Sequence, residues 1–277
     1  MDDFKDSFLL ALDSLREYLP DIVISGGWVP FVYYAYAAET RPSQEPLRTK
    51  DIDLLIPEKL RIGKRPSLNK ILEREKFKPN EIGISLGSFG RKGPNEVKYE
   101  ATKDGIEIEV TFLTPRLGKE SRPAISIQGS VVATLLRYMD ILLKCNMEVR
   151  ILDQTSKGKK VDFKARVPIP AAYLYQKGLS FVDRPTRDKK AKDLYYFFDI
   201  LANYAELRDE CIKEIPKIQR GFPGKWYKRF KGNLNSHFES PESEGPVLVE
   251  EQRPGGGSSS EFRRTVFGTF QHFLKKI

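Results

Sequence analysis

The spacing of hydrophobic residues changes from helical to alternating within the first half of the chain, and this change limits the possible folds. Residues 82–89, 96–102 and 106–113 alternate between polar and apolar side chains, which predicts three strands. Lys103-Asp104-Gly105 separates the last two runs and is typical of a hairpin turn. Because helix and strand patterns precede these runs, we expect an α+β fold, a mixed β-sheet with flanking helices.

The elements expected before these strands alternate between helix and strand. We expect helices over 4–18, 28–38 and 67–76, strands over 22–25 and 52–56, and a loop over 39–50. Ser67 is a residue type that commonly caps a helix, and the loop contains two prolines.

The rest of the chain is expected to be mostly helical. The expected elements are helices over 131–145, 171–181, 188–203, 205–219 and 261–276, strands over 147–152 and 161–167, and an irregular stretch over 221–254. We therefore expect a sheet-bearing domain over residues 1–130 and a mainly helical domain over residues 131–277, with a flexible segment at about 240–260.

Positive charge is concentrated in the second of these domains. The net charge is +9, and residues 1–130 hold 20 basic and 20 acidic side chains, whereas residues 131–277 hold 27 and 18. Basic residues are densest over 157–192 and 213–231, and the second cluster includes Phe222, Trp226, Tyr227 and Phe230. Basic and aromatic residues together suit a single-stranded RNA or a tRNA end, and a solvated lysine-rich surface is the alternative.

Several classes of protein do not fit the sequence. No apolar run approaches the roughly 20 residues of a membrane helix, and the apolar run over 8–12 is too short for a signal peptide. Cys145 and Cys211 lack ligand-like spacing, and with only His237 and His272 a histidine-rich metal site is excluded. We therefore expect a cytoplasmic protein.

Two aspartates at the start of a strand are the main candidates for chemistry. Asp51 and Asp53 are two residues apart, so their side chains point to the same face of the strand. Neighbouring carboxylates repel unless a cation lies between them, and hard oxygen ligands suit Mg²⁺ or Mn²⁺. Ser25, Gly26 and Gly27 lie between a strand and a helix, where backbone N–H groups can approach a phosphate closely. The combination indicates a site for a nucleoside triphosphate and its metal, and an idle surface pair of aspartates is the alternative.

A third carboxylate is needed to complete a two-metal site. Glu107 and Glu109 share one face of the strand over 106–113. We expect Glu109 to be the third ligand, with Glu107 as the alternative. Charged residues alternating with Ile and Val are also what any half-exposed strand shows.

These residues, in this order, resemble the DNA polymerase β-like nucleotidyltransferase superfamily. Its pattern is an apolar residue with Gly and Gly or Ser, a spacer, Asp-apolar-Asp-apolar and a later acid. The matching segments are Ile24-Ser25-Gly26-Gly27, Asp51-Ile52-Asp53-Leu54 and Ile108-Glu109-Val110. The spacer over residues 28–50 is longer than is usual in the family, and an insertion in the loop over 39–50 explains the excess. The resemblance does not choose between Glu107 and Glu109.

Residues 166–200 resemble the AbiEii/MenT-type branch of the superfamily, the nucleotidyltransferase toxins of type IV toxin–antitoxin systems. The match consists of a helix with Lys177, a basic turn, and Lys192-Asp193 before a Tyr-rich helix. It implies that Lys177 neutralises the triphosphate and that Asp193 orients Lys177 or a water. The further candidates for binding phosphates are the basic residues Lys50, Arg187, Lys189, Lys190 and Lys192. We expect the aromatic run over 195–198 to be mostly core.

The pattern and the resemblance together predict a Mg²⁺-dependent enzyme that transfers a nucleoside monophosphate from an NTP to an acceptor. The preferred acceptor is an RNA or tRNA 3′ end, in a toxin with a cognate antitoxin partner. A protein hydroxyl and a small molecule are the alternative acceptors. A non-catalytic RNA-binding or antitoxin-like module is the alternative of another class.

Overall fold

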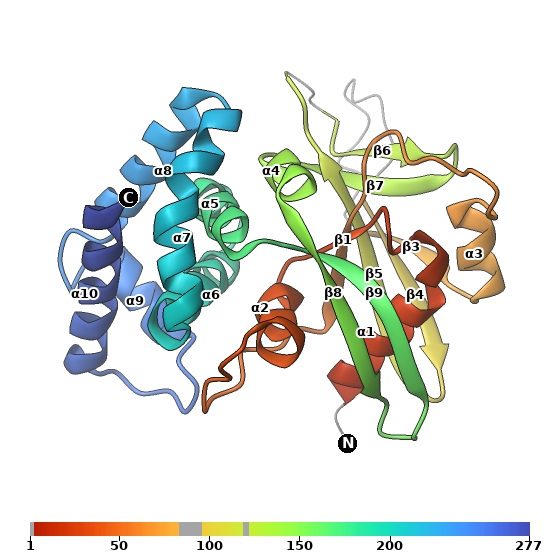
Figure 1. Cartoon of the computed structure of the whole chain (residues 1–277), viewed down its shortest axis with the longest axis horizontal. Coiled ribbons are helices and arrows are strands. Elements are labelled where there is room, and N and C mark those ends of the chain that lie inside the picture. The colour runs from red at the N-terminus through yellow and green to blue at the C-terminus, as the bar shows by residue number, and fades with distance from the viewer. Residues whose placement is uncertain (1–2, 83–95, 119–121) are drawn as a thin grey trace. The chain divides into compact units, whose positions relative to one another are not determined.

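The structure is a computed structural model that describes residues 3–82, 96–118 and 122–277 (Figure 1). The chain forms two compact units. The sheet unit comprises Met1–Ala37 and Arg48–Pro168, and the helical unit comprises Ala38–Leu47 and Ile169–Ile277. The expected α+β fold is confirmed, because a mixed sheet with helices is followed by a helical C-terminal region.

Nine strands of the described residues form the sheet. They are β1 (Val23–Ser25), β2 (Asp51–Leu55), β3 (Lys78–Ile82), β4 (Glu96–Lys103), β5 (Ile106–Pro115), β6 (Ala124–Ile127), β7 (Val131–Leu136), β8 (Asn146–Gln154) and β9 (Lys160–Pro168). The main order is β3-β4-β5-β2-β1-β9-β8, and β7 pairs with both β5 and β6. β2 is antiparallel to β1 and parallel to β5, so it lies in the middle of the sheet.

The hairpin between β4 and β5 sets the register of the strands beside β2. Asp104 and Gly105 have φ angles of 51° and 78°, and positive φ at both central residues is characteristic of a type I′ turn. Lys103 therefore pairs with Ile106, and each residue before Lys103 pairs with the corresponding residue after Ile106. This confirms the predicted hairpin.

Short helices cover the sheet unit. They are α1 (Asp3–Ser14), α2 (Trp28–Val32), α3 (Leu68–Arg74) and α4 (Met139–Lys144), with a 3₁₀ turn over Arg16–Tyr18 and a π-helical turn over Tyr33–Ala37. The ring of Phe8 on α1 stacks on Trp28 of α2 at 4.4 Å, so the first two predicted helices pack on each other. Ser67 accepts a hydrogen bond from the backbone N–H of Lys70, which confirms it as the N-cap of α3.

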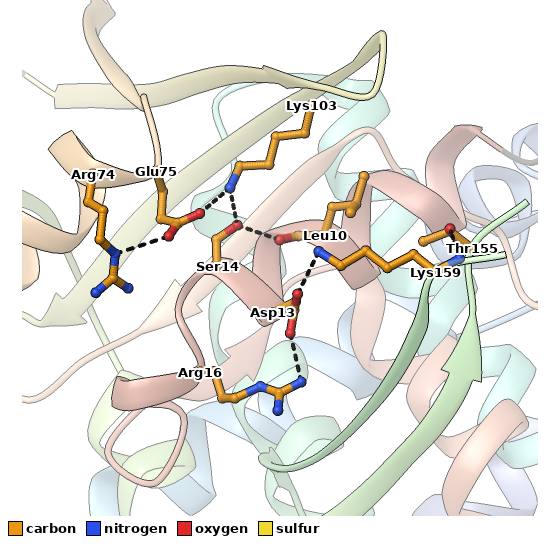
Figure 2. A network of polar contacts seen from close by, with 9 residues as sticks. All are labelled: Leu10, Asp13, Ser14, Arg16, Arg74, Glu75, Lys103, Thr155 and Lys159. Carbon is orange, nitrogen blue, oxygen red and sulfur yellow. Dashed lines mark hydrogen bonds and ion pairs between the residues drawn. The ribbon is translucent and has the colours of Figure 1, made fainter. Parts of the chain in front are cut away.

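A polar network ties α1 to the end of α3, to β4 and to the turn before β9 (Figure 2). The ammonium of Lys103 donates to Ser14 at 2.7 Å and pairs with Glu75 at the end of α3. On the other side of α1, Asp13 pairs with Lys159 at 2.7 Å. Residues alternate across a strand, so Lys103 lies on the face of β4 opposite to Lys98 and Glu100. The network therefore anchors α1 to one face of the sheet and leaves the other face for different residues.

The helical unit is built around aromatic side chains. Its helices are α5 (Pro170–Ser180), α6 (Arg187–Asn203), α7 (Ala205–Ile218), α8 (Gly224–His237), α9 (Glu244–Glu251) and α10 (Ser260–Lys276), with 3₁₀ turns over Phe181–Asp183 and Gln219–Gly221. Phe197 of α6 lies 5.2 Å from Phe270 of α10, and Phe238 stacks on Phe270 at 3.7 Å. The aromatic run over 195–198 is buried, as predicted. None of the described helices has the length and hydrophobicity that a membrane span requires.

Two segments differ from the sequence-based expectation. Residues 131–145 do not form one helix but β7 and the short α4, because Val131–Leu136 pairs with strands on both sides. Residues 221–254 are not irregular, since they contain α8 and α9, and α9 lies within the segment expected to be flexible. The strand expected over 82–89 overlaps β3 at Ile82, and its remaining residues lie outside the described part of the chain.

The boundary between the two units falls after Pro168, whereas the sequence suggested a division after residue 130. The physical reason is that β7, β8 and β9 are strands of the same sheet as β1 and β2. The loop after α2 also has an unexpected place. Ala38–Leu47 belongs to the helical unit, where Thr40 donates a hydrogen bond to Glu206 of α7 at 3.2 Å.

Candidate active site

The strand register brings the predicted carboxylates together on one face of the sheet. Asp51 of β2 lies directly opposite Glu109 of β5, and Asp53 lies opposite Ser25 of β1. Paired residues on neighbouring strands point to the same face, as do residues two apart on one strand. Asp51, Asp53 and Glu109 therefore share one face, although they come from two strands that are distant in sequence.

The glycine turn after β1 is shaped around Asp53. Gly26 has a φ of +66°, and a Cβ atom built there would lie 2.2 Å from Oδ2 of Asp53. Only glycine leaves room for the carboxylate at this backbone conformation. Ser25 is buried and donates from Oγ to the carbonyl oxygen of Asp53 at 3.1 Å. Gly27 precedes α2. The Ser-Gly-Gly segment thus holds Asp53 against the turn.

Two lysines neutralise the other carboxylates. Nζ of Lys98 on β4 lies 2.8 Å from Oδ1 of Asp51 and 3.0 Å from Oε2 of Glu109. Lys50, directly before β2, pairs with Oε1 of Glu109 and lies 3.1 Å from Oε2 of Glu107. Both carboxylate oxygens of Glu109 therefore face an ammonium group.

These contacts give Glu109 and Glu107 different surroundings. The Glu109 side chain is only 16% exposed, whereas that of Glu107 is 75% exposed. Burial raises the pKa of Glu109, but hydrogen bonds from Lys50 and Lys98 outweigh burial and bring this pKa down to about 2. Burial lowers the pKa of Lys98, and its bonds to Asp51 and Glu109 raise it by more, so that it stays charged. Glu109 is thus an ionised carboxylate held opposite Asp51.

A hollow of about 530 Å³ lies beside Glu109 on the sheet. Lys76, Lys78, Glu100 and Thr102 form part of its lining, together with Glu107 and Glu109. Charged and hydroxyl side chains predominate, so the hollow suits a polar molecule. Its position gives such a molecule access to the Glu109 side chain.

The candidate residues of the helical unit form a buried ion cluster. Lys177 on α5 pairs with Asp193 on α6, and their side chains are 4% and 5% exposed. Nε of Arg184 lies 2.5 Å from Oδ2 of the same aspartate, and Arg184 is the more exposed cation. Burial raises the pKa of Asp193, but Arg184 and Lys177 outweigh burial and hold this pKa below its usual value.

The other basic candidates lie on the surface of α6. Arg187 pairs with Glu251 at 2.7 Å, Lys190 with Glu244 at 3.5 Å, and Lys192 with Asp188 at 3.0 Å. Lys189 is exposed. These residues are not gathered around Lys177, because they project outward at the start of the helix.

Lys98 is the residue that sequence reasoning missed. It occupies a polar position of the strand expected over 96–102, where any half-exposed strand carries charges. A usable signal was nevertheless present, because the Asp104-Gly105 turn implies the pairing of Lys103 with Ile106 and hence of Lys98 with Thr111. That register places Lys98 beside the carboxylates.

The donor set fits a hard divalent cation. Asp51 and Glu109 already share one positive group within hydrogen-bond distance, and all the available donors are carboxylate oxygens, which suit Mg²⁺ or Mn²⁺. In the part of the chain that the structure describes, no group of three or more His, Cys, Asp and Glu residues is gathered as a metal cluster. Lysines lie between the carboxylates instead.

Comparison with known proteins gives the family. A family model described as Nucleotidyltransferase matches residues 8–215. The chain belongs to the nucleotidyltransferase family. As a nucleotidyltransferase it is an enzyme, and NTP is the substrate that the family implies. The matched range includes the Ser-Gly-Gly segment, Asp51, Asp53, Glu109 and the Lys177 cluster.

Two crystal structures are similar to this nucleotidyltransferase at low identity. One is an antigenic nucleotidyltransferase-like protein from Paracoccidioides brasiliensis, with 14% identity and a TM-score of 0.37 over 79% of this chain and 92% of that chain. The other is a proposed nucleotidyltransferase from H. pylori, with 13% identity and a TM-score of 0.44 over 100% of this chain and 96% of that chain. A search of curated proteins finds no match.

Proposed function

We propose that the enzyme transfers a nucleoside monophosphate from an NTP to an acceptor hydroxyl at Asp51, Asp53 and Glu109. The observation that carries this proposal is the register of β2 and β5, which sets Asp51 opposite Glu109 and beside Asp53. We assign the three carboxylates as ligands of Mg²⁺ or Mn²⁺, which would offset the negative charge of the transferring phosphate.

The surroundings of each carboxylate suggest its role. A carboxylate with a pKa near 2 is a weak base, so Glu109 is better suited to holding a cation than to taking a proton. Glu107 is assigned no ligand role, because its side chain is largely exposed and pairs with Lys50. Gly26 fixes Asp53, and we propose that Ser25, Gly26 and Gly27 lie along the NTP phosphates with Lys50 nearby.

By resemblance to the superfamily, we also propose that the Lys177 cluster of the helical unit binds phosphate groups. Asp193 holds Lys177 and Arg184 together as one cationic group with a net charge of about +1. In this arrangement Asp193 is a positioning residue, and Arg184 is the part exposed to solvent. Arg187 and Lys192 lie apart from this cluster at the start of α6, where each pairs with an acidic side chain, and we propose them as separate phosphate contacts.

An RNA or tRNA 3′ end is the proposed acceptor. The support comes from the start of α8. The ring of Trp226 stacks at a centroid distance of 5.7 Å on Phe222, which directly precedes the helix, and Lys225 and Lys228 are exposed. Bases can stack on half-exposed rings while lysines contact phosphates. By resemblance we also propose a toxin role in the cytoplasm, with an antitoxin protein as partner.

Labelled NTPs test the reaction and its acceptor. The protein is incubated with each α-labelled NTP, Mg²⁺ or Mn²⁺, and total RNA, total protein or a small-molecule extract. We expect label in RNA, a loss of at least about 100-fold for D51N, D53N and E109Q, and little change for E107Q. Equal transfer by D51N and wild type would refute the site, and label in protein or in a small molecule would replace RNA as acceptor. No transfer, with salt-sensitive RNA binding, would favour a binding module.

A further inference from the structure

Lys98 occupies the place where the proposed metal ligands need a cation. Its Nζ atom lies 2.8 Å from Oδ1 of Asp51 and 3.0 Å from Oε2 of Glu109. Lys98 reaches this position from β4, on the far side of β5 from β2. The ammonium therefore bridges two strands that are not its own.

The contact with Lys98 offsets the repulsion between two neighbouring carboxylates in the metal-free protein. Carboxylates opposite each other on neighbouring strands repel, and the repulsion would push the Asp51 and Glu109 side chains apart. Lys98 supplies the missing positive charge, and its side chain is only 27% exposed, so solvent screens the contact incompletely. Lys50 adds a second positive charge on the other oxygen of Glu109.

The same contact uses the oxygens that a metal would need. Oδ1 of Asp51 and Oε2 of Glu109 are both directed at the ammonium. A lysine has a flexible four-carbon stem, so its head can leave while β4 stays in place. An arginine at this position would bind the carboxylates through a planar fork and would be harder to displace.

We propose that Lys98 is a built-in counter-cation that holds Asp51 and Glu109 side by side in the metal-free enzyme and that a divalent metal displaces. This inference rests on the proposed metal site. Lys98 thereby stabilises the metal-free fold and weakens metal binding. Removing its charge should therefore lower the stability of the metal-free protein and raise its affinity for the metal. Removal of a lysine with only a structural role would lower the stability and leave the metal affinity unchanged.

Metal binding to the full-length protein tests the proposal without any assay of activity. Mn²⁺ affinity is measured by calorimetry or by electron paramagnetic resonance for wild type, K98M, K98Q and K98R. We expect K98M to bind Mn²⁺ about tenfold more tightly, K98Q to change in the same direction, and K98R to bind no more tightly than wild type. In EDTA, K98M and K98Q should melt at a lower temperature than wild type.

Lys78 provides the matched control. It lies on the same sheet face two strands from Glu109, in the cross-strand row Lys78, Glu100, Glu109, so it is not a direct cross-strand neighbour of either ligand. K78M removes the same charge at about 10 Å, so it reports the long-range electrostatic effect alone. We expect its Mn²⁺ affinity to stay within about twofold of wild type.

The outcomes separate this inference from the proposed function. Unchanged or weaker Mn²⁺ binding by both K98M and K98Q, or an equal gain by K78M, overturns the counter-cation while the metal site stands. Wild-type protein that binds no Mn²⁺, or D51N and E109Q variants that bind it as wild type does, overturns the metal site and the inference together.

Discussion

Asp51 and Glu109 lie directly opposite each other on two parallel strands, β2 and β5. Parallel strands cannot be joined by a tight turn, so this pairing depends on long connections and on the rest of the sheet. The site therefore forms only when the sheet unit is folded. Variants that loosen the glycine turn or the sheet should lose activity before they lose all structure.

Gly26 is expected to be intolerant of any side chain. The G26A substitution should cost about 1 kcal/mol for positive φ and about 2 kcal/mol more for the contact with the Asp53 carboxylate. Gly63 is the control, because its φ is +65° and no atom lies within 4 Å of a Cβ built there. Urea denaturation should show a clearly larger loss for G26A than for G63A, with transfer activity lost only in G26A. Equal losses would show that the Asp53 contact is unimportant.

The Lys177–Asp193 pair is expected to support the helical unit. K177M should destabilise the protein by about 3 kcal/mol, because Asp193 is buried and keeps only Arg184 as a cationic partner. K189M removes an exposed lysine of α6 and should change stability by less than about 0.5 kcal/mol. Denaturation curves of the two variants decide the matter, and a K177M protein as stable as K189M would contradict the assignment.

Asp199 on α6 should make stability depend on pH. Burial raises its pKa to about 6, and the hydrogen bond from Asn203 opposes this only in part. Within the described residues, its Oδ2 atom is buried without a hydrogen-bond partner. The folded state therefore holds the proton more tightly than the unfolded state, so the carboxyl costs nothing below pH 4 and costs most above pH 6.

The D199N variant should remove this penalty. Its free energy of unfolding is expected to exceed that of wild type by about 2 kcal/mol at pH 7.5 and to match it near pH 4. D209N, at an exposed aspartate of α7, should follow the wild-type curve at both pH values. A D199N protein with no gain at pH 7.5 would argue against a buried, ionised Asp199.

The exposed lysines of α8 are expected to bind RNA phosphates. The K225E/K228E double variant should weaken binding of a single-stranded RNA at least about tenfold and lower the slope of log K against log salt by about 1. K64E reverses an exposed charge in the sheet unit and serves as the control. Filter binding at several salt concentrations measures both quantities. Identical behaviour of the two variants would mean that α8 is not the RNA surface.

Local patterns predicted most helices and strands, but they predicted a helix where the structure has β7. Val131–Leu136 is a short apolar run, and such a run fits a buried strand and a buried helix equally well. Two contacts decided in favour of the strand: the antiparallel pairing with β6, which directly precedes it, and the parallel pairing with β5, which is more distant in the sequence. In α8 the opposite error arose, because glycines and polar residues obscured the helical spacing of Trp226, Phe230 and Leu234.

The candidate site was predicted by residue type and not by arrangement. The Asp-x-Asp spacing was enough to place Asp51 and Asp53 on one face. The contrast between Glu109 and Glu107 required the register of β5 against β2, which no local pattern contains. The place of Lys98 could be predicted in part. The two-residue turn is sufficient to derive its position near Glu109, but its contact with Asp51 also depends on the pairing of β2 with β5.

The loop after α2 has a mechanical consequence. The chain passes between the two units three times, after Ala37, after Leu47 and after Pro168, so no single cut can separate them. A protein shortened to end at Pro168 would keep a ten-residue segment that has lost its folding partner. Only residues 48–50 separate that segment from β2, and Lys50 is the last of them. The loop is thus a covalent link that joins the helical unit directly to the strand that carries Asp51 and Asp53.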